Sequence, residues 1–390
     1  MIQKIKRPVV LWFVALLLLG GTLAFQIKND RLFAIAKSID IFATLIRELD
    51  TYYVDQIDPE KLLTVGIQAM LEELDPYTEY IPEEESDDFR MLTTGEYAGV
   101  GALIGNRGEG NIVIMPYTGF PAQNAGMRIG DLLLKVDSIA VLKKTTSEVS
   151  ELLKGPANTG VTVTVKRGED TLQFSLNRKK ISLKNVPFYG KLDEQTGYIK
   201  LSDFTTNASA EVRNALVSLK AQGATQLVLD LRDNPGGLIN EAVEIVNLFV
   251  PKGKEVVKTI GKLQQVNYTY KTNKTPVDTK IGIIVLINDR SASAAEIVAG
   301  ALQDYDRAVL LGQKSFGKGL VQTTLPLSFN AQIKVTTAKY YIPSGRCIQA
   351  IDYAKSRVDG SAGTVPDSLR KAFKTTNGRI VLDGAGIEPD

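Results

Sequence analysis

The chain has 390 residues, 44% of them hydrophobic, and its 46 basic side chains nearly balance its 44 acidic ones. This length predicts two or three domains, and the near-neutral charge argues against nucleic acid as a partner. The sequence contains no histidine, which excludes a Ser-His-Asp triad and any histidine-based metal site or general base. The lone Cys347 cannot form an internal disulfide or, without histidine, belong to a zinc cluster. We expect no metal and no cofactor.

The N-terminus carries Lys4, Lys6 and Arg7 before an uncharged, apolar run over residues 9–25. As a helix this run would span about 26 Å, slightly less than a hydrocarbon core of about 30 Å. The basic flank predicts a cytoplasmic N-terminus and export of the remainder. We interpret residues 1–28 as a membrane anchor, with a cleavable signal as the alternative. Both interpretations place most of the chain outside the cytoplasm, in the periplasm or an equivalent space.

Residues 29–94 carry apolar side chains at the spacing of amphipathic helices, with a helix end near Leu74-Asp75-Pro76. We predict an N-terminal helical region. Its apolar stripes either pack into a core or form a dimerisation surface, because short helices seldom bury an apolar face alone. Both interpretations stay open, and with them the question of a homo-oligomer.

Residues 95–180 change to short β-type runs that are punctuated by glycine. We predict a helix from Thr146 to Leu153 and strands at Ile112–Ile114, Leu132–Val136 and Val161–Val165. Together with the block Pro121–Asp131, this stretch resembles a PDZ domain. The resemblance implies a domain that binds the C-terminal tails of proteins.

The same resemblance places a carboxylate-binding loop at Tyr97-Ala98-Gly99-Val100-Gly101. Glycines let consecutive backbone N–H groups converge on one anion, and a free strand edge beside them can accept an extended peptide. We therefore expect Gly99, Val100 and Gly101 to bind a peptide's terminal carboxylate. A plain surface turn is the alternative.

Residues 181–390 alternate between predicted strands and helices, which indicates an α/β layered core. The expected elements are strands at Tyr198–Leu201, Leu227–Leu231 and Ile281–Ile287, a helix from Ser209 to Gln222, and a helix that ends at Leu248. Two polar stretches, near 256–279 and 350–379, are predicted to be exposed insertions.

Ser293 follows the last of these strands and precedes a helix-forming run that begins at Ala294. At such a junction, free backbone N–H groups and the positive end of the helix dipole point toward a bound oxyanion. A helix N-cap is the alternative role for this serine. The turn Arg232-Asp233-Asn234-Pro235-Gly236-Gly237 also ends a buried strand. An amide from Gly236 or Gly237, with that of Ala294, would form a two-donor oxyanion hole; a simple strand-to-helix turn is the alternative.

Without histidine, a reactive serine must pass its proton to a lysine, and Lys318, between two glycines, is the candidate. Its pKa would have to fall by roughly 3 units, at a cost of about 4 kcal/mol, which is within the range for buried lysines. Gln322 could hold the amine without adding charge. The alternatives are a solvated loop lysine and a phosphate-binding loop. Gly319 replaces the Ser or Thr of the latter, and a predicted strand follows instead of a helix.

Together with Tyr341–Arg346, these motifs resemble in order and spacing the C-terminal processing peptidases, or tail-specific proteases, in a Bacteroidetes-type form. The resemblance covers nearly the whole chain after the anchor. It implies a crotonase- or ClpP-like layered α/β serine protease core with an inserted PDZ domain. It also implies a Ser-Lys dyad of Ser293 and Lys318. The resemblance also implies that Gln322 positions the base and that Glu296 has a supporting role. It implies that the amides of Gly236 or Gly237 and of Ala294 bind the oxyanion.

Two departures from the family pattern concern the C-terminal part of the chain. A polar insertion separates Cys347-Ile348-Gln349 from Gly384–Asp390, where many relatives are nearly continuous. Members of this form usually continue past the last motif, so we expect that C-terminal sequence is missing here.

The predicted function is an anchored, extracytoplasmic serine endopeptidase that cuts protein substrates near apolar C-terminal tails. The PDZ groove would bind the terminal carboxylate while Ser293 attacks an upstream peptide bond. A non-catalytic, peptide-binding envelope scaffold with the same fold is the main alternative. Acyl-thioester chemistry of the crotonase type is another, and the PDZ domain argues against it.

Overall fold

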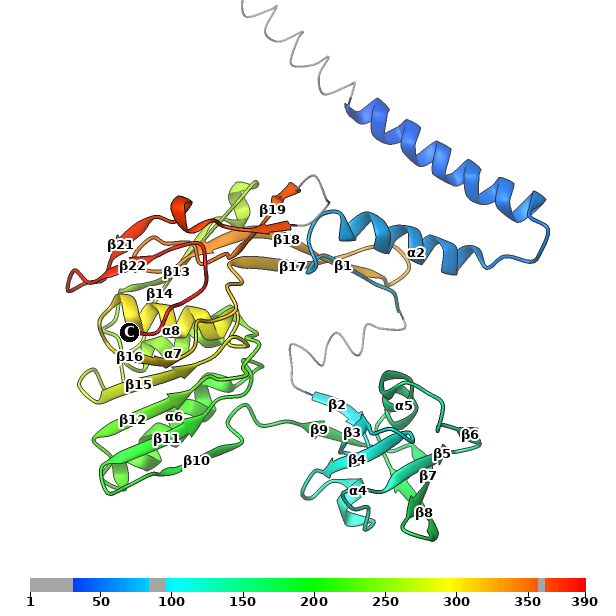
Figure 1. Ribbon diagram of the computed structural model, residues 1–390, viewed down its shortest axis with the longest axis horizontal. Coiled ribbons are helices and arrows are strands. Elements are labelled where there is room, and N and C mark those ends of the chain that lie inside the picture. Colours follow the sequence, from blue (N-terminus) through cyan, green and yellow to red (C-terminus); the bar gives the residue numbers. More distant parts are fainter. Residues whose placement is uncertain (1–30, 84–95, 357–361) are drawn as a thin grey trace, which may run out of the picture. The chain divides into compact units, whose positions relative to one another are not determined.

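The computed structural model describes residues 31–83, 96–356 and 362–390 (Figure 1). The predicted anchor, residues 1–28, lies outside these ranges. Among the described residues, no helix is both long and apolar enough to cross a membrane. The chain divides into two compact units, Met1–Met70 and Leu71–Asp390.

The described residues of the first unit, 31–70, are mostly helical. One helix covers residues 31–52, and α2 (Pro59–Glu72) follows it. Phe33, Ile39, Val65 and Met70 all have side chains that are more than half exposed. The core-packing interpretation therefore does not hold for these residues, and the dimerisation surface stays a prediction.

The PDZ region of the second unit is built around the sheet β3-β4-β5-β7-β8, with β6 paired to β5 and a separate β2-β9 pair. Helix α5 (Thr146–Leu153) has the predicted bounds, because Thr145 and Glu148 form a capping box at its start. Val113, Leu133 and Val163 are fully buried between the elements. The other elements are β2 (Glu96–Gly99), β3 (Ala102–Asn106), β4 (Asn111–Pro116), α4 (Pro121–Asn124), β5 (Leu132–Val136), β6 (Ile139–Ala140), β7 (Gly160–Arg167), β8 (Asp170–Asn177) and β9 (Lys179–Ser182).

The α/β core predicted for residues 181–390 begins with a five-stranded sheet in the order β10-β11-β12-β15-β16, in which only β10 is antiparallel to its neighbour. Its central strands β12 and β15 are apolar runs whose alternate residues are buried in the main core, while the residues between them are mostly half-buried. Every residue of α8 is buried. The elements are β10 (Phe188–Lys191), β11 (Thr196–Lys200), α6 (Ala208–Ala221), β12 (Gln226–Asp230), α7 (Ile239–Asn247), β15 (Gly282–Ile287), α8 (Ala294–Asp304) and β16 (Val309–Gly312).

A second sheet of the core has the order β1-β18-β13-β14, with β17 also paired to β18. Helices α7 and α8 contact both each other and β13, and α8 also contacts β16, so the two helices lie between the two sheets (Figure 1). The strands are β1 (Glu79–Ile81), β13 (Glu255–Gly261), β14 (Tyr268–Lys271), β17 (Leu320–Pro326) and β18 (Gln332–Tyr341). Smaller elements are η2 (Gln264–Val266), β19 (Ile351–Ser356), β20 (Ala362–Thr364), η3 (Asp367–Leu369), β21 (Ala372–Lys374) and β22 (Ile380–Leu382).

The prediction of an exposed insertion at 256–279 is wrong. Strands β13 and β14 lie in this stretch and belong to the second sheet. Val256 and Val257 are fully buried in the main core, and Thr259 is 3% exposed. The polar composition was misleading because lysines of a strand can face water while its apolar residues pack inward. The described part of 350–379 is mostly exposed or half-buried, as predicted, although Thr375 is buried.

Candidate active site

Ser293 lies at the junction between strand β15 and helix α8, as the sequence predicts. The turn that carries it is held by two hydrogen bonds to the segment Leu231–Gly237. Ser291 Oγ donates to the carbonyl of Leu231 at 2.7 Å, and the amide of Ala292 donates to the carbonyl of Asn234 at 2.9 Å. These bonds hold the 231–237 segment next to the turn that carries Ser293, although the two are far apart in the sequence.

The backbone of Ser293 is strained, with φ 54° and ψ −113°. A non-glycine residue in such a conformation costs about 1–3 kcal/mol and usually marks a functional turn. The neighbouring Gly236 leaves no room for a side chain. A Cβ on Gly236 would lie 2.8 Å from Ser293 Cβ and 2.7 Å from the carbonyl oxygen of Ala292. Glycine is therefore required at 236 because the turn that carries Ser293 approaches its Cα directly.

The expected oxyanion donors differ in their availability. The amide of Gly236 donates to Asn234 Oδ1 at 2.8 Å, so this group is already bonded within its own turn. The amides of Gly237 and Ala294 make no hydrogen bond to any described residue. Ala294 is fully buried at the first position of α8. The geometry thus favours Gly237 and Ala294 as the donor pair and gives Gly236 a steric role.

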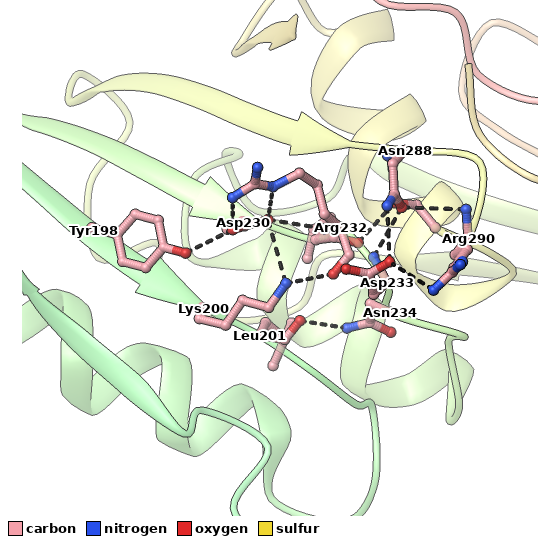
Figure 2. A network of polar contacts seen from close by, with 11 residues as sticks. Tyr198, Lys200, Leu201, Asp230, Arg232, Asp233, Asn234, Asn288 and Arg290 are labelled. Atoms are coloured by element: carbon pink, nitrogen blue, oxygen red, sulfur yellow. Dashed lines mark hydrogen bonds and ion pairs between the residues drawn. The ribbon is translucent and has the colours of Figure 1, made fainter. Parts of the chain in front are cut away.

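The Arg232–Gly237 turn is supported by a network around Asp230, at the end of β12 (Figure 2). Asp230 is 1% exposed and accepts hydrogen bonds from Tyr198 Oη at 2.6 Å and Arg232 Nη2 at 2.6 Å. Lys200 Nζ lies 3.5 Å from its other oxygen. Burial alone would raise the pKa of Asp230, but the bonds from Arg232 and Tyr198 lower it to about 2. The carboxylate therefore stays charged and anchors the turn.

The same turn is held on its other side by polar side chains (Figure 2). Asn234 is fully buried and donates from Nδ2 to the carbonyl of Leu201 at 2.8 Å. Asp233, at φ 62°, exchanges hydrogen bonds of 2.9 Å with Asn288. These hydrogen bonds hold the residues just before Gly236 against Leu201 on one side and Asn288 on the other.

Glu296 connects the turn that carries Ser293 with the loop that carries Lys318. Its carboxyl is fully buried and accepts four hydrogen bonds: from the amides of Ser293 at 2.8 Å, Gly317 at 2.7 Å and Lys318 at 2.9 Å, and from Ser315 Oγ at 2.5 Å. Burial raises the pKa of Glu296 to about 7, and the four donors oppose that rise. One side chain therefore fixes the backbone on both sides of the candidate dyad.

Lys318 enters the site from the loop that precedes β17. A Cβ on Gly317 would lie 2.5 Å from Ala350 Cβ, and one on Gly319 would lie 2.8 Å from the amide of Gln349. The two glycines that frame the lysine are thus explained by close packing against the 347–350 segment. Since β17 is a strand, the phosphate-binding alternative lacks its helix.

The Lys318 side chain is half-buried, and burial lowers its pKa. The positive charge of Lys334 lowers it further, while Glu79, Asp75 and Glu296 oppose the shift. Lys318 Nζ makes no hydrogen bond to any described residue, Ser293 included. It lies instead over the ring of Tyr77, 4.2 Å from the centroid. Sequence reasoning did not find Tyr77, because nothing near it in the chain points to Lys318.

Gln322 lies on β17 in the same sheet. Its Nε2 donates to Thr336 Oγ1 on β18 at 3.1 Å, and it makes no hydrogen bond to Lys318. The role expected for Gln322, holding the amine, stays a prediction.

The loop at residues 97–101, predicted to bind a carboxylate, lies between β2 and β3. Gly101 adopts φ 74°, and a Cβ there would lie 2.4 Å from Phe120 Cβ. The amides of Val100 and Gly101 donate to no described group, whereas Gly99 pairs with Lys179 in the β2-β9 ladder. β3 follows directly and is the last strand on its side of the sheet, with α5 in contact with it. An extended peptide could pair with that edge.

Two family models match the chain. Residues 195–358 match Peptidase family S41, and residues 113–167 match a PDZ domain.

Individual proteins are similar over most of the chain. A carboxy-terminal-processing protease of Bartonella bacilliformis is 36% identical over 351 residues, which cover 88% of this chain and 80% of that protein. A probable CtpA-like serine protease of Staphylococcus aureus strain N315 is 34% identical over 351 residues, covering 86% of this chain and 70% of that protein. The solved structure of a photosystem II D1 C-terminal processing protease is 32% identical, with a TM-score of 0.46, and the match covers 79% of this chain and 89% of that one.

Proposed function

The chain belongs to peptidase family S41, among its C-terminal processing serine proteases, and we propose that Ser293 and Lys318 form its catalytic dyad. The observation that carries the proposal is the buried Glu296 carboxyl, which is bonded to the backbone of both residues. The enzyme is proposed to act outside the cytoplasm, which the basic flank and apolar run of the N-terminus support. Protease added to spheroplasts should then digest it, and protection would contradict that location.

The proposed reaction starts with attack of Ser293 Oγ on the carbonyl carbon of the scissile peptide bond. Neutral Lys318 takes the hydroxyl proton, and the amides of Gly237 and Ala294 donate to the oxyanion that forms. Collapse of this intermediate breaks the C–N bond, and Lys318 returns the proton to the leaving amine. Water then hydrolyses the acyl ester, with Lys318 again as base. Since Nζ rests on Tyr77 in this structure, the flexible lysine side chain must turn toward Ser293 first.

Activity should rise with pH and stay high on the alkaline side. The base works only when neutral, so activity is lost as pH falls through the Lys318 pKa, which burial holds below its ordinary value. Burial also raises the pKa of Glu296 to about 7, so this carboxyl changes its charge within the tested range. Initial cleavage rates of an unfolded protein with an apolar tail, measured from pH 5 to 10, test this. A falling alkaline limb below pH 9 would contradict it.

We also propose that the PDZ domain binds the substrate's free C-terminus through the amides of Val100 and Gly101. Amidating the C-terminus of a peptide substrate should then weaken binding by about 1.5–3 kcal/mol, the value of a hydrogen bond to a charged group. Titration of the Ser293→Ala variant with matched free-acid and amidated peptides measures the difference. Equal binding and equal cleavage of the two peptides would remove the tail-reading part of the proposal and leave the dyad untouched. Tight tail binding without any cleavage by the wild type would favour the scaffold alternative.

A further inference from the structure

Tyr77 lies in a short turn between α2 and β1 that is rigidly held. Asp75 is 9% exposed, and its Oδ1 accepts the amides of Tyr77 at 2.8 Å and Thr78 at 2.9 Å. Its Oδ2 accepts Thr78 Oγ1 at 3.0 Å. The turn leads directly into β1, where Glu79 pairs with Lys334 of β18. Tyr77 is thus attached to the sheet that also contains β17, the strand that follows Lys318.

The Tyr77 ring presents one face to the lysine ammonium. At 4.2 Å from the centroid, Nζ is well within the roughly 6 Å over which a cation is attracted to an aromatic face. The ring of Tyr353 meets Tyr77 edge-on, with centroids 6.0 Å apart and an interplanar angle of 88°. Burial raises the pKa of the Tyr77 phenol above its ordinary value, so the ring is neutral over the working range. Tyr77 therefore covers the amine without adding a charge beside it.

We propose that Tyr77 is a positioning residue for the catalytic base: its ring is the wall on which Lys318 rests between turnovers and which keeps water from Nζ. This inference rests on the proposed function, because it assigns Tyr77 to the residue proposed as base. The ring has two opposite effects on the lysine. Its cover disfavours the ammonium, whereas the electron-rich face attracts it.

Other charged groups act on Lys318 from the surrounding elements. Lys334 on β18 disfavours the ammonium, and Glu79 on β1, Asp75 before it and Glu296 on α8 favour it. A test of Tyr77 must leave these four groups in place. Substitutions confined to the ring do so, because the bonds of Asp75 go to the backbone of Tyr77 and to Thr78.

Three substitutions separate the two effects of the ring. Tyr77→Phe keeps both the cover and the aromatic face, so the protonation midpoint of Lys318 should not move. Tyr77→Ala removes both the cover and the aromatic face. Because desolvation shifts a lysine pKa more than a partly exposed cation–π contact does, the midpoint should rise by about one pH unit. Tyr77→Leu keeps apolar cover but removes the aromatic face, so the midpoint should fall.

The midpoint can be read without any cleavage. Competitive labelling with acetic anhydride from pH 6 to 11, followed by peptide mass spectrometry, gives the titration of Lys318 in the full chain with Ser293→Ala. Exposed Lys314 in the same loop is the internal control for the extent of labelling in every variant. In the chain with Ser293 intact, the acidic limb of the cleavage rate should move in the same direction as the labelling midpoint.

An unchanged midpoint in Tyr77→Ala, or equal shifts in the Phe and Ala variants, would overturn the inference. If Tyr77→Ala does not fold, Tyr77→Leu decides, because an unchanged or raised midpoint there contradicts contact with the ring face. A wrong assignment of the Ser293–Lys318 dyad would give a different result. Lys318→Ala would then remain active while the labelling midpoints still followed Tyr77.

Discussion

Ser293→Ala and Lys318→Ala should each abolish cleavage, with rates reduced on the order of 10⁴-fold or more, while the thermal unfolding temperature stays close to that of the wild type. Residues that act as one catalytic unit are non-additive, so the double variant should be no worse than either single one. Stability should change little, because Lys318 Nζ makes no hydrogen bond to a described residue. Ser293 takes part in a capping box at the start of α8, and losing its hydroxyl there should cost about 1 kcal/mol.

Controls for this prediction are available in the same region. Lys314→Ala removes an exposed lysine of the same loop, and Ser328→Ala removes an exposed serine next to β17; both should cleave normally. Lys318→Arg should be as inactive as Lys318→Ala, because a guanidinium stays charged at every usable pH. Proteolysis by purified Ser293→Ala, or measurable activity of Lys318→Arg at any pH, would remove the dyad assignment.

Glu296→Gln should reduce both activity and stability, although it changes a single atom. The substitution replaces one carboxylate oxygen with an amide NH₂ group, which donates hydrogen bonds and accepts none. At Oε1 this group would face the donors Ser315 Oγ and the Gly317 amide. At Oε2 it would face the amides of Ser293 and Lys318. Buried donors left without an acceptor cost about 1–3 kcal/mol each. We expect the free energy of unfolding to fall by at least that amount and cleavage to fall by about 10²-fold or more, because misplacing the nucleophile or the base is costly.

Denaturant unfolding and cleavage rates at pH 8, above the Glu296 pKa of about 7, would measure both effects. Glu169→Gln is the matched control, since Glu169 is exposed at a turn of the PDZ domain and should be silent. Wild-type stability and activity in Glu296→Gln would show that the bridge between the two loops is dispensable. Loss of stability with full activity would confine Glu296 to a structural role.

Local sequence patterns predicted several element bounds and the family of this protein. The bounds of β5 and α5 follow from a buried β-type run and a capping box, which act within a few residues. The absence of histidine leads to the prediction of a lysine base, and the order of the glycine, serine and lysine motifs indicates the family. Composition alone misjudged 256–279, because the buried face of β13 is formed by few residues among many polar ones.

The tertiary structure decided how these motifs meet. The family pattern predicted a supporting role for Glu296. Its hydrogen bonds to Gly317 and Lys318 form only because α8 packs against the loop that carries Lys318. Likewise, only the folded turn shows that the Asn234 side chain accepts the hydrogen bond of the Gly236 amide. The contact between Tyr77 and Lys318 depends on the pairing of β1 with β18. Such contacts join segments far apart in the chain, and local propensity carries no information about them.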